Sequence, residues 1–176
     1  MVKTVYIRPI VEAELELLAL LFQEPDEASE YGFFGYGDPG RLRRDFAENG
    51  FFTDHSGRLA VAVGSARESS EFVGEVGWHR VTTGPTSSSW NIGIGLLAKA
   101  RGQGYGTRAQ RLLAEYLFAH TQLNRVEAST EVDNVVERRS LEKAGFSYEG
   151  VLRGACFRGG QWRDMASYSM VRADVG

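Results

Sequence analysis

A glycine-rich turn, Arg101-Gly-Gln-Gly-Tyr-Gly-Thr107, lies between an apolar strand pattern and an amphipathic helix pattern. Glycine lets the backbone turn tightly and approach a ligand closely, and the first amides of a helix have no partner within the helix. The turn therefore predicts an anion site, most naturally for a phosphate or pyrophosphate. The alternative is a turn that only packs the strand against the helix.

Two common nucleotide-binding patterns do not explain this turn. A nucleoside-triphosphate loop needs Gly-x-x-x-x-Gly-Lys followed by Ser or Thr, and the turn contains no such pair. Residues 93–98 match a dinucleotide fingerprint formally, but they lie inside a predicted strand in which no helix begins.

The apolar pattern predicts one α+β domain with a mixed sheet over residues 1–176. Strands are expected at residues 4–8, 59–63, 73–78, 90–97 and 125–130, helices at 11–22, 39–48, 107–120 and 134–144, and a hairpin at 150–158 and 161–172. The first helix is expected to stop at Pro25 and the second to have Asp38 as its N-cap. Residues 82–89 are expected to form a loop. The strand–helix–strand order of residues 90–130 predicts a parallel strand pair.

Charge and cysteine content exclude several classes of function. The net charge of −3 argues against sequence-independent nucleic-acid binding, which uses a basic surface. One cysteine, Cys156, and three scattered histidines predict neither a disulfide nor a bound metal. The first residues carry acids where a signal peptide is apolar, and no apolar run approaches the about 20 residues of a membrane span. We therefore expect a cytoplasmic protein that does not contact membranes.

Two motifs in register resemble a known superfamily. Arg101-x-x-Gly104-x-Gly106 fits the signature of the GNAT acyl-CoA-dependent N-acyltransferases. Asn134, eleven residues before Gly145-Phe146, and the later Gly160-x-Trp162-x-Asp164 are similar to the RimJ/RimL-like branch, named for ribosomal-protein N-terminal acetyltransferases. The resemblance covers essentially the whole chain. It implies a mostly antiparallel sheet with a central, splayed parallel pair, helices on both faces and a C-terminal β-hairpin.

The resemblance also implies acetyl-CoA as co-substrate, without a metal. Family members hold the coenzyme pyrophosphate on the backbone amides of the signature, which here fall on Gln103, Gly104, Tyr105, Gly106 and Thr107. The strand end near Leu97 and the helix-opening Asn134 are expected to contact the pantetheine arm. Arg138 shares a helix face with Asn134, so it is a further candidate for coenzyme contact, with a solvated arginine as the alternative.

The proton donors typical of the family are missing. A Tyr seven residues after the Asn is replaced by Leu141, and a Ser three residues after it is replaced by Glu137. Glu137 is a candidate acid if its pKa is raised, and an exposed surface glutamate is the alternative. A base must also take a proton from the acceptor ammonium. The candidate bases are Glu75, His79, Glu131 and Asp133. Of these, we name Glu75 as the predicted catalytic base.

An aromatic segment at residues 31–37 falls where the family binds its acceptor. Its candidate substrate-binding side chains are Tyr31, Phe33, Phe34 and Tyr36. They are expected to form a mobile lid or, alternatively, a cluster that seals the edge of the domain. Acidic residues before the segment, at positions 24–30, are candidates to attract a cationic amine, with a solvated loop as the alternative.

The function implied is transfer of an acetyl group from acetyl-CoA to a primary amine, either a protein N-terminus or a small molecule. The amine attacks directly in a ternary complex, within a monomer or a homodimer. Two alternatives stay open: a sensor that binds acyl-CoA without turnover, and a transferase of the same fold that uses aminoacyl-tRNA as donor.

Overall fold

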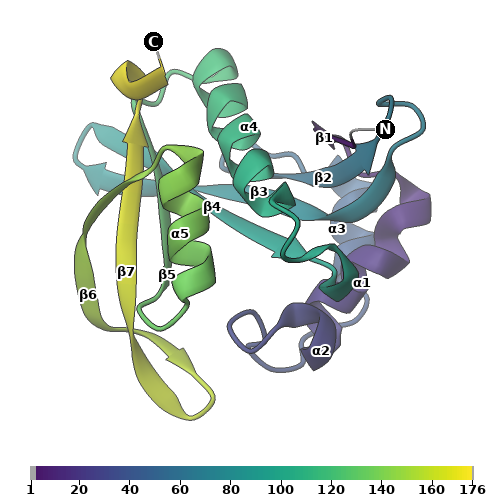
Figure 1. Cartoon of the computed structure of the whole chain (residues 1–176), viewed down its shortest axis with the longest axis horizontal. Coiled ribbons are helices and arrows are strands. Elements are labelled where there is room, and N and C mark those ends of the chain that lie inside the picture. Colours follow the sequence, from purple (N-terminus) through teal and green to yellow (C-terminus); the bar gives the residue numbers. More distant parts are fainter. Residues whose placement is uncertain (1–2, 176) are drawn as a thin grey trace.

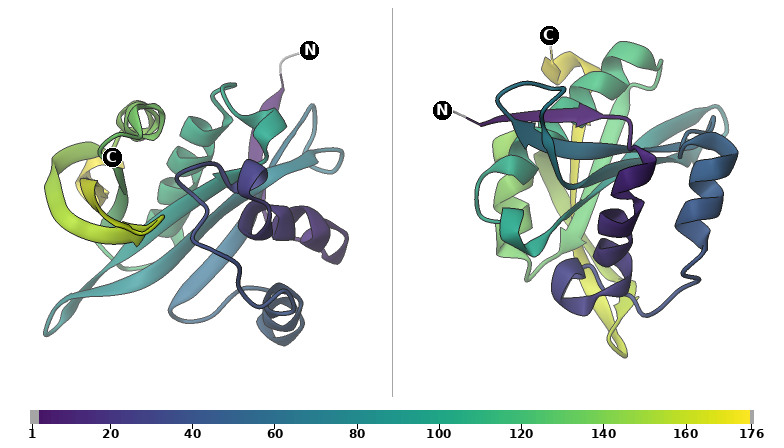
Figure 2. Two further views of the ribbon diagram at one scale, coloured as in Figure 1. Left: turned by 90° about the horizontal axis from the view of Figure 1, so that it is seen from below. Right: turned by 90° about the vertical axis from the view of Figure 1, so that its right-hand side faces the viewer.

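Seven strands form one mixed sheet, and helices cover both of its faces (Figures 1 and 2). The computed structural model describes residues 3–175, and the strand order is β1-β2-β3-β4-β5-β7-β6. The strands are β1 Thr4–Arg8, β2 Ser56–Gly64, β3 Glu71–Gly84, β4 Ser87–Leu96, β5 Arg125–Glu131, β6 Ser147–Arg158 and β7 Gln161–Val171. The helices are α1 Leu15–Gln23, α2 Pro25–Ala28, α3 Arg41–Asn49, α4 Tyr105–His120 and α5 Val135–Ala144, with 3₁₀ turns η1 Glu12–Glu14, η2 Ala98–Ala100 and η3 Arg172–Val175. The predicted α+β fold with a C-terminal hairpin is confirmed.

Two apolar cores lie on opposite faces of the sheet, one under α4 and α5 and the other under α1 and α3. Successive strand residues point to opposite faces, so Val61 belongs to the first core and its neighbour Ala60 to the second. Leu113 and Leu117 of α4 are fully buried on one side, and Leu18 of α1 on the other. We call these two sides the α4 face and the α1 face.

Strands β4 and β5 are parallel neighbours that separate after two paired positions. Trp90 pairs with Val126 and Asn91 with Glu127, and no pairing continues beyond them. Figure 1 shows the two strands diverging toward their carboxyl ends. We call residues 92–96 of β4 and 128–131 of β5 the splay. Because α4 follows β4 and α5 follows β5, the amino-terminal ends of both helices lie beyond the splay.

The predicted loop at residues 82–89 is wrong. Strand β3 continues to Gly84 and β4 begins at Ser87, so the two strands form a long hairpin. Thr82, Thr83 and Ser87 are exposed, and a strand that is solvated on both faces shows no apolar alternation.

Helix starts differ from prediction more than helix ends do. The N-cap of α3 is Gly40, because Asp38 instead closes the preceding turn by accepting a 2.9 Å hydrogen bond from the Gly40 amide. The first helix opens as η1 and becomes α-helical only at Leu15, and Pro25 begins α2 rather than only ending α1. Ends at left-handed glycines are confirmed, with φ of 62° at Gly50 and 99° at Gly145.

Candidate active site

The glycine turn leaves a row of backbone amides free at the start of α4. Gly104 is the N-cap, with φ of 77°, and the Arg108 amide bonds back to its carbonyl at 3.3 Å. The amides of Tyr105, Gly106 and Thr107 precede this bond and have no partner within the helix. These N–H groups and the positive end of the helix dipole suit a phosphate. A side chain on Gly104 would meet no atom within 4 Å, so the turn is open on its outer side.

Arg101 holds this turn in place rather than facing a ligand. Its Nε donates to the Leu96 carbonyl at 3.0 Å, and its guanidinium also donates to the Asp26 and Glu27 carbonyls of α2. The Glu27 carboxylate accepts a 2.7 Å bond from the Ala98 amide. Together these bonds fasten α2 to the end of β4. The signature arginine therefore acts as a structural clamp in this fold.

The edge of β4 that faces β5 carries free backbone groups in the splay. The Leu97 amide bonds to the Val73 carbonyl of β3 at 2.9 Å. Because backbone groups alternate in direction along a strand, the amides of Ile94 and Leu96 point the other way, toward β5. Leu97 itself is only 3% exposed and its amide is used. The Leu96 carbonyl accepts from Arg101, so the free groups nearest the predicted pantetheine contact are the amide of Leu96 and the backbone groups of Ile94.

Asn134 caps α5, and both polar ends of its side chain are bonded. Oδ1 accepts from the Glu137 amide at 3.2 Å, and Nδ2 donates to Thr130 Oγ1 at 2.9 Å. This explains why the sequence places Asn between β5 and α5. A coenzyme contact by Asn134 stays a prediction, since it would share or replace one of these bonds.

Arg138 is directed toward β6 and β7, away from the glycine turn. Its Nε donates to the Tyr168 hydroxyl at 3.2 Å, its Nη1 donates to the Val132 carbonyl at 3.1 Å, and its guanidinium lies over the Tyr148 ring. The residues that α5 turns toward α4 are Glu137 and Ser140 instead.

Glu137 is half-buried between α5 and α4, so it is not an exposed surface glutamate. One carboxylate oxygen accepts a hydrogen bond from Gln110 Nε2. Burial raises the pKa of Glu137 to about 7, even though the Gln110 hydrogen bond acts in the opposite direction. A carboxyl with this pKa exchanges protons near neutral pH, as a general acid must.

Glu75 is buried on the α1 face of β3, beside the splay. Its register partner is Gly95 of β4, and a side chain on Gly95 would lie 3.6 Å from Glu75 Oε1. Arg58 Nε is 3.7 Å from Glu75 Oε2, and Phe22 lies against the arginine. Burial raises the pKa of Glu75, and the Arg58 charge opposes that rise. Glu75 Oε2 and Arg58 Nη1 are buried without a hydrogen-bond partner among residues 3–175.

The other candidate bases are less suited. His79 is exposed. Glu131 is held by two hydrogen bonds from Arg158, which keep its pKa below the ordinary value. Asp133 is exposed, and its carbonyl accepts a 3.3 Å bond from the Tyr31 hydroxyl.

The aromatic segment divides into an anchored and an exposed part. Tyr31 reaches across to the β5–α5 connection through Asp133, and the Arg158 guanidinium lies 5.5 Å from its ring centre. Phe34 and Tyr36 are 65% and 80% exposed, and Tyr36 packs edge-on against Phe33. Figure 2 shows the segment as an open loop between α2 and α3. The segment thus combines features of the predicted seal with features of the predicted lid.

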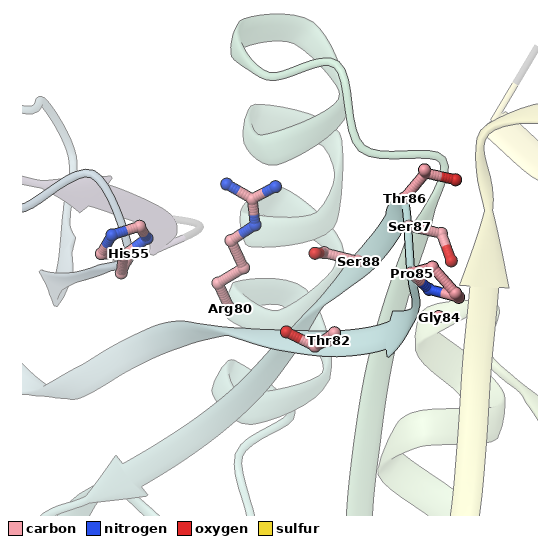
Figure 3. Close-up of a pocket in the computed structure, with 8 residues that line it drawn as sticks. All are labelled: His55, Arg80, Thr82, Gly84, Pro85, Thr86, Ser87 and Ser88. Carbon is pink, nitrogen blue, oxygen red and sulfur yellow. The ribbon is translucent and has the colours of Figure 1, made fainter.

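A depression of about 430 Å³ lies at the β3–β4 hairpin and contains none of the predicted site residues (Figure 3). Arg80 and His55 line it together with hydroxyl-bearing residues. A smaller depression of about 100 Å³ adjoins the glycine turn at Gln103 and Tyr105. Within residues 3–175, no three His, Cys, Asp or Glu side chains gather as a metal site requires. No helix in this part of the chain is long and apolar enough to cross a bilayer.

Comparisons with known proteins agree with this geometry. A family model described as "Acetyltransferase (GNAT) domain" matches residues 4–147. The Bacillus subtilis (strain 168) protein named "Probable N-acetyltransferase YjcK" is 28% identical over 184 residues, covering 98% of this chain and 96% of that protein.

Two solved structures share the fold. Spermidine N-acetyltransferase from Vibrio cholerae, in complex with CoA and spermine, has a TM-score of 0.81 at 17% identity over 97% of this chain and 96% of that one. RimJ from Mycobacterium smegmatis, in complex with CoA-disulfide, has a TM-score of 0.74 at 23% identity over 97% and 83%. The predicted resemblance to the GNAT superfamily is confirmed: the chain belongs to the GNAT family of N-acetyltransferases.

Proposed function

We propose that the protein transfers an acetyl group from acetyl-CoA to a primary amine by direct attack within a ternary complex. One observation carries the proposal. The free amides of α4 lie at the end of the splay, and each face of the sheet carries one titratable carboxyl. These carboxyls are Glu137 on the α4 face and Glu75 on the α1 face.

The coenzyme would bind along the α4 face. The amides of Tyr105, Gly106 and Thr107 suit its pyrophosphate, and the outward backbone groups of Ile94 and the Leu96 amide suit the amides of the pantetheine arm. These strand-end N–H groups are also the donors available to stabilise negative charge that develops on the thioester oxygen.

The two carboxyls divide the proton transfers. Glu75 takes a proton from the ammonium through water, and the neutral amine attacks the thioester carbonyl carbon. The nitrogen then gives a second proton to water as the amide forms. As the carbon–sulfur bond breaks, Glu137 gives a proton to the departing sulfur. An alkyl thiol such as cysteine has a pKa of about 8.5, so transfer from a carboxyl with a pKa of about 7 is favourable.

The acceptor would approach from the α1 face past the aromatic segment. Spermidine and short peptides with free N-termini are the first amines to test, because the Vibrio cholerae structural neighbour is a spermidine N-acetyltransferase and a RimJ shares the fold. Acids at positions 24–30 favour a cationic acceptor in either case. We expect the protein to act in the cytoplasm, and this location fits both classes of acceptor.

The test is amine-dependent release of coenzyme A thiol from acetyl-CoA, measured with a colorimetric thiol reagent over a panel of amines. We expect release with at least one primary amine and none with its N-acetylated form. Arg80→Ala, at the distant hairpin depression, serves as a control that keeps wild-type activity. Binding of acetyl-CoA without release of thiol for any amine in the panel would support a non-catalytic sensor instead. Absence of acetyl-CoA binding would favour aminoacyl-tRNA as the acyl donor.

A further inference from the structure

Gln110 is a buried polar residue on the otherwise apolar face of α4 that packs on the sheet. It is 2% exposed, and both Ala109 beside it and Leu113 three residues later are fully buried. A buried amide is costly unless its polar atoms are bonded. Both ends of the Gln110 amide are bonded, and both partners lie on α5.

The hydrogen bonds around Gln110 form a chain with one direction. Ser140 Oγ donates to Gln110 Oε1 at 3.4 Å, which uses the only proton of that hydroxyl. The 2.9 Å contact between Thr107 Oγ1 and Ser140 Oγ must then be donated by Thr107. Gln110 Nε2 donates at the other end to Glu137 Oε1. The chain therefore runs from the glycine turn, through Ser140 and Gln110, to Glu137.

This direction decides where the proton of Glu137 resides. Oε1 is an acceptor from Gln110, so in the neutral acid the proton belongs on Oε2. Among residues 3–175 the hydrogen bond to the Glu137 carboxyl is made to Oε1, and Oε2 is not one of the three buried side-chain atoms that lack a partner. Glu137 Oε2 therefore reaches solvent. A proton on this oxygen is available for transfer, whereas one on Oε1 would face Gln110.

The charged groups around Glu137 do not compete with this arrangement. Glu137 forms no ion pair among the described residues, and α4 faces it with the neutral Gln110. On α5 the Arg138 guanidinium turns to Tyr168, and Arg139 is exposed. On β5, Glu131 is paired with Arg158. Among residues 3–175, Gln110 is thus the side chain that hydrogen-bonds and orients the Glu137 carboxyl.

We propose that Gln110 is a positioning residue that, with Thr107 and Ser140, presents the acid proton of Glu137 on Oε2 to the departing sulfur of the coenzyme. In this step the carbon–sulfur bond breaks, sulfur accepts the Oε2 proton and Glu137 is left as a carboxylate. The nitrogen, now bonded to the acetyl carbon, gives up its second proton to water, water returns a proton to Glu137, and the first proton leaves Glu75 to solvent. The inference rests on the proposed acetyl transfer and names the device that orients its acid.

Gln110→Met keeps the length of the side chain and removes both hydrogen bonds. We expect kcat to fall roughly tenfold, with the KM for acetyl-CoA unchanged. Because Gln110 stabilises the carboxylate, its loss raises the pKa of Glu137, so the alkaline limb of the kcat–pH profile should move to higher pH. Ser140→Ala interrupts the chain without touching Glu137 and should give a smaller loss of kcat. Glu115→Gln, on the outer side of α4, is the control that leaves both measurements unchanged.

A direct readout is the titration of the Glu137 carboxyl by NMR with carbon-13-labelled glutamate, assigned by Glu137→Gln. We expect a midpoint near pH 7 in the wild type and a higher one in Gln110→Met. An ordinary glutamate midpoint in the wild type, the same midpoint in both proteins, or undiminished kcat in Glu137→Gln overturns the inference. Failure of acetyl-CoA to raise the melting temperature of the wild type would instead overturn the proposed function, and the titration would still decide the role of Gln110.

Discussion

The glycine turn at the start of α4 and the aromatic segment between α2 and α3 are two different kinds of predicted binding surface. The first presents backbone amides, which any residues with the right φ angles would supply. The second presents side chains whose positions depend on partners far away in sequence, such as Tyr31 on the Asp133 carbonyl and under Arg158. We therefore expect binding of the coenzyme pyrophosphate to depend mainly on the backbone, whereas single side chains control binding of the acceptor.

Glu75→Gln should have the largest effect, on the acceptor side. A general base contributes about 10²- to 10⁴-fold, so we expect kcat/KM to fall by roughly 10³-fold while acetyl-CoA binding is kept. The raised pKa of Glu75 means that the folded state holds this proton more tightly than the unfolded state does, so its stabilising effect is lost as the pH rises. The stability of the variant relative to the wild type should therefore increase as the pH rises above the ordinary pKa of a glutamate. Steady-state kinetics and thermal melting at several pH values check both points, and unchanged kinetics would remove Glu75 from the mechanism.

Gly104→Ala should damage the coenzyme side through the backbone alone. The added methyl group meets no atom within 4 Å, but φ of 77° costs a non-glycine residue about 1–2 kcal/mol. We expect weaker acetyl-CoA binding together with that loss of stability. Gly37→Ala is the matched control, because its methyl group also meets nothing and its φ lies outside the left-handed region. Equal behaviour of the two variants in calorimetric binding and denaturant unfolding would contradict a backbone site.

Arg101→Lys should loosen the clamp between α2 and β4. Lysine cannot supply the forked donors that reach the Leu96 and Glu27 carbonyls together, so we expect a loss of about 1–2 kcal/mol in the free energy of unfolding. Denaturant unfolding measures this loss. Since the Arg101 clamp joins the coenzyme side to the acceptor side, the affinities for acetyl-CoA and for the amine should both weaken. A change in only one of these affinities would argue that the clamp does not join the two sides.

Tyr31→Phe should have the smallest effect, confined to the acceptor. The variant keeps the ring under Arg158 and removes the hydrogen bond to Asp133. A neutral, partly exposed hydrogen bond contributes about 0.5–1.5 kcal/mol, so the KM for the amine should rise a few-fold with kcat unchanged. A rise in the KM for acetyl-CoA instead would place Tyr31 on the coenzyme side.

The same contrast explains what could be predicted from the sequence. The element order, the parallel pair and the glycine turn follow from local patterns, and so does Asn134 as the cap of α5. The Arg58–Glu75 pair and the anchoring of Tyr31 join separate strands and loops, so no local pattern indicates them. Gln110 did leave a signal, because a polar residue on the apolar face of α4 needs a partner. The contact between the Arg138 side chain and Tyr168 was not predictable. The four-residue spacing from Asn134 places Arg138 on one face of α5 but does not indicate which neighbouring element that face meets.

Thermal melting with and without saturating acetyl-CoA tests the central claim most directly. Ligand at about 100 times its dissociation constant adds about 2.7 kcal/mol, which at this chain length raises the melting temperature by roughly 5–11 °C. We predict this rise for the wild type and for Glu75→Gln, and a smaller one for Gly104→Ala. A folded wild-type protein whose melting temperature does not change would contradict a coenzyme site at the start of α4.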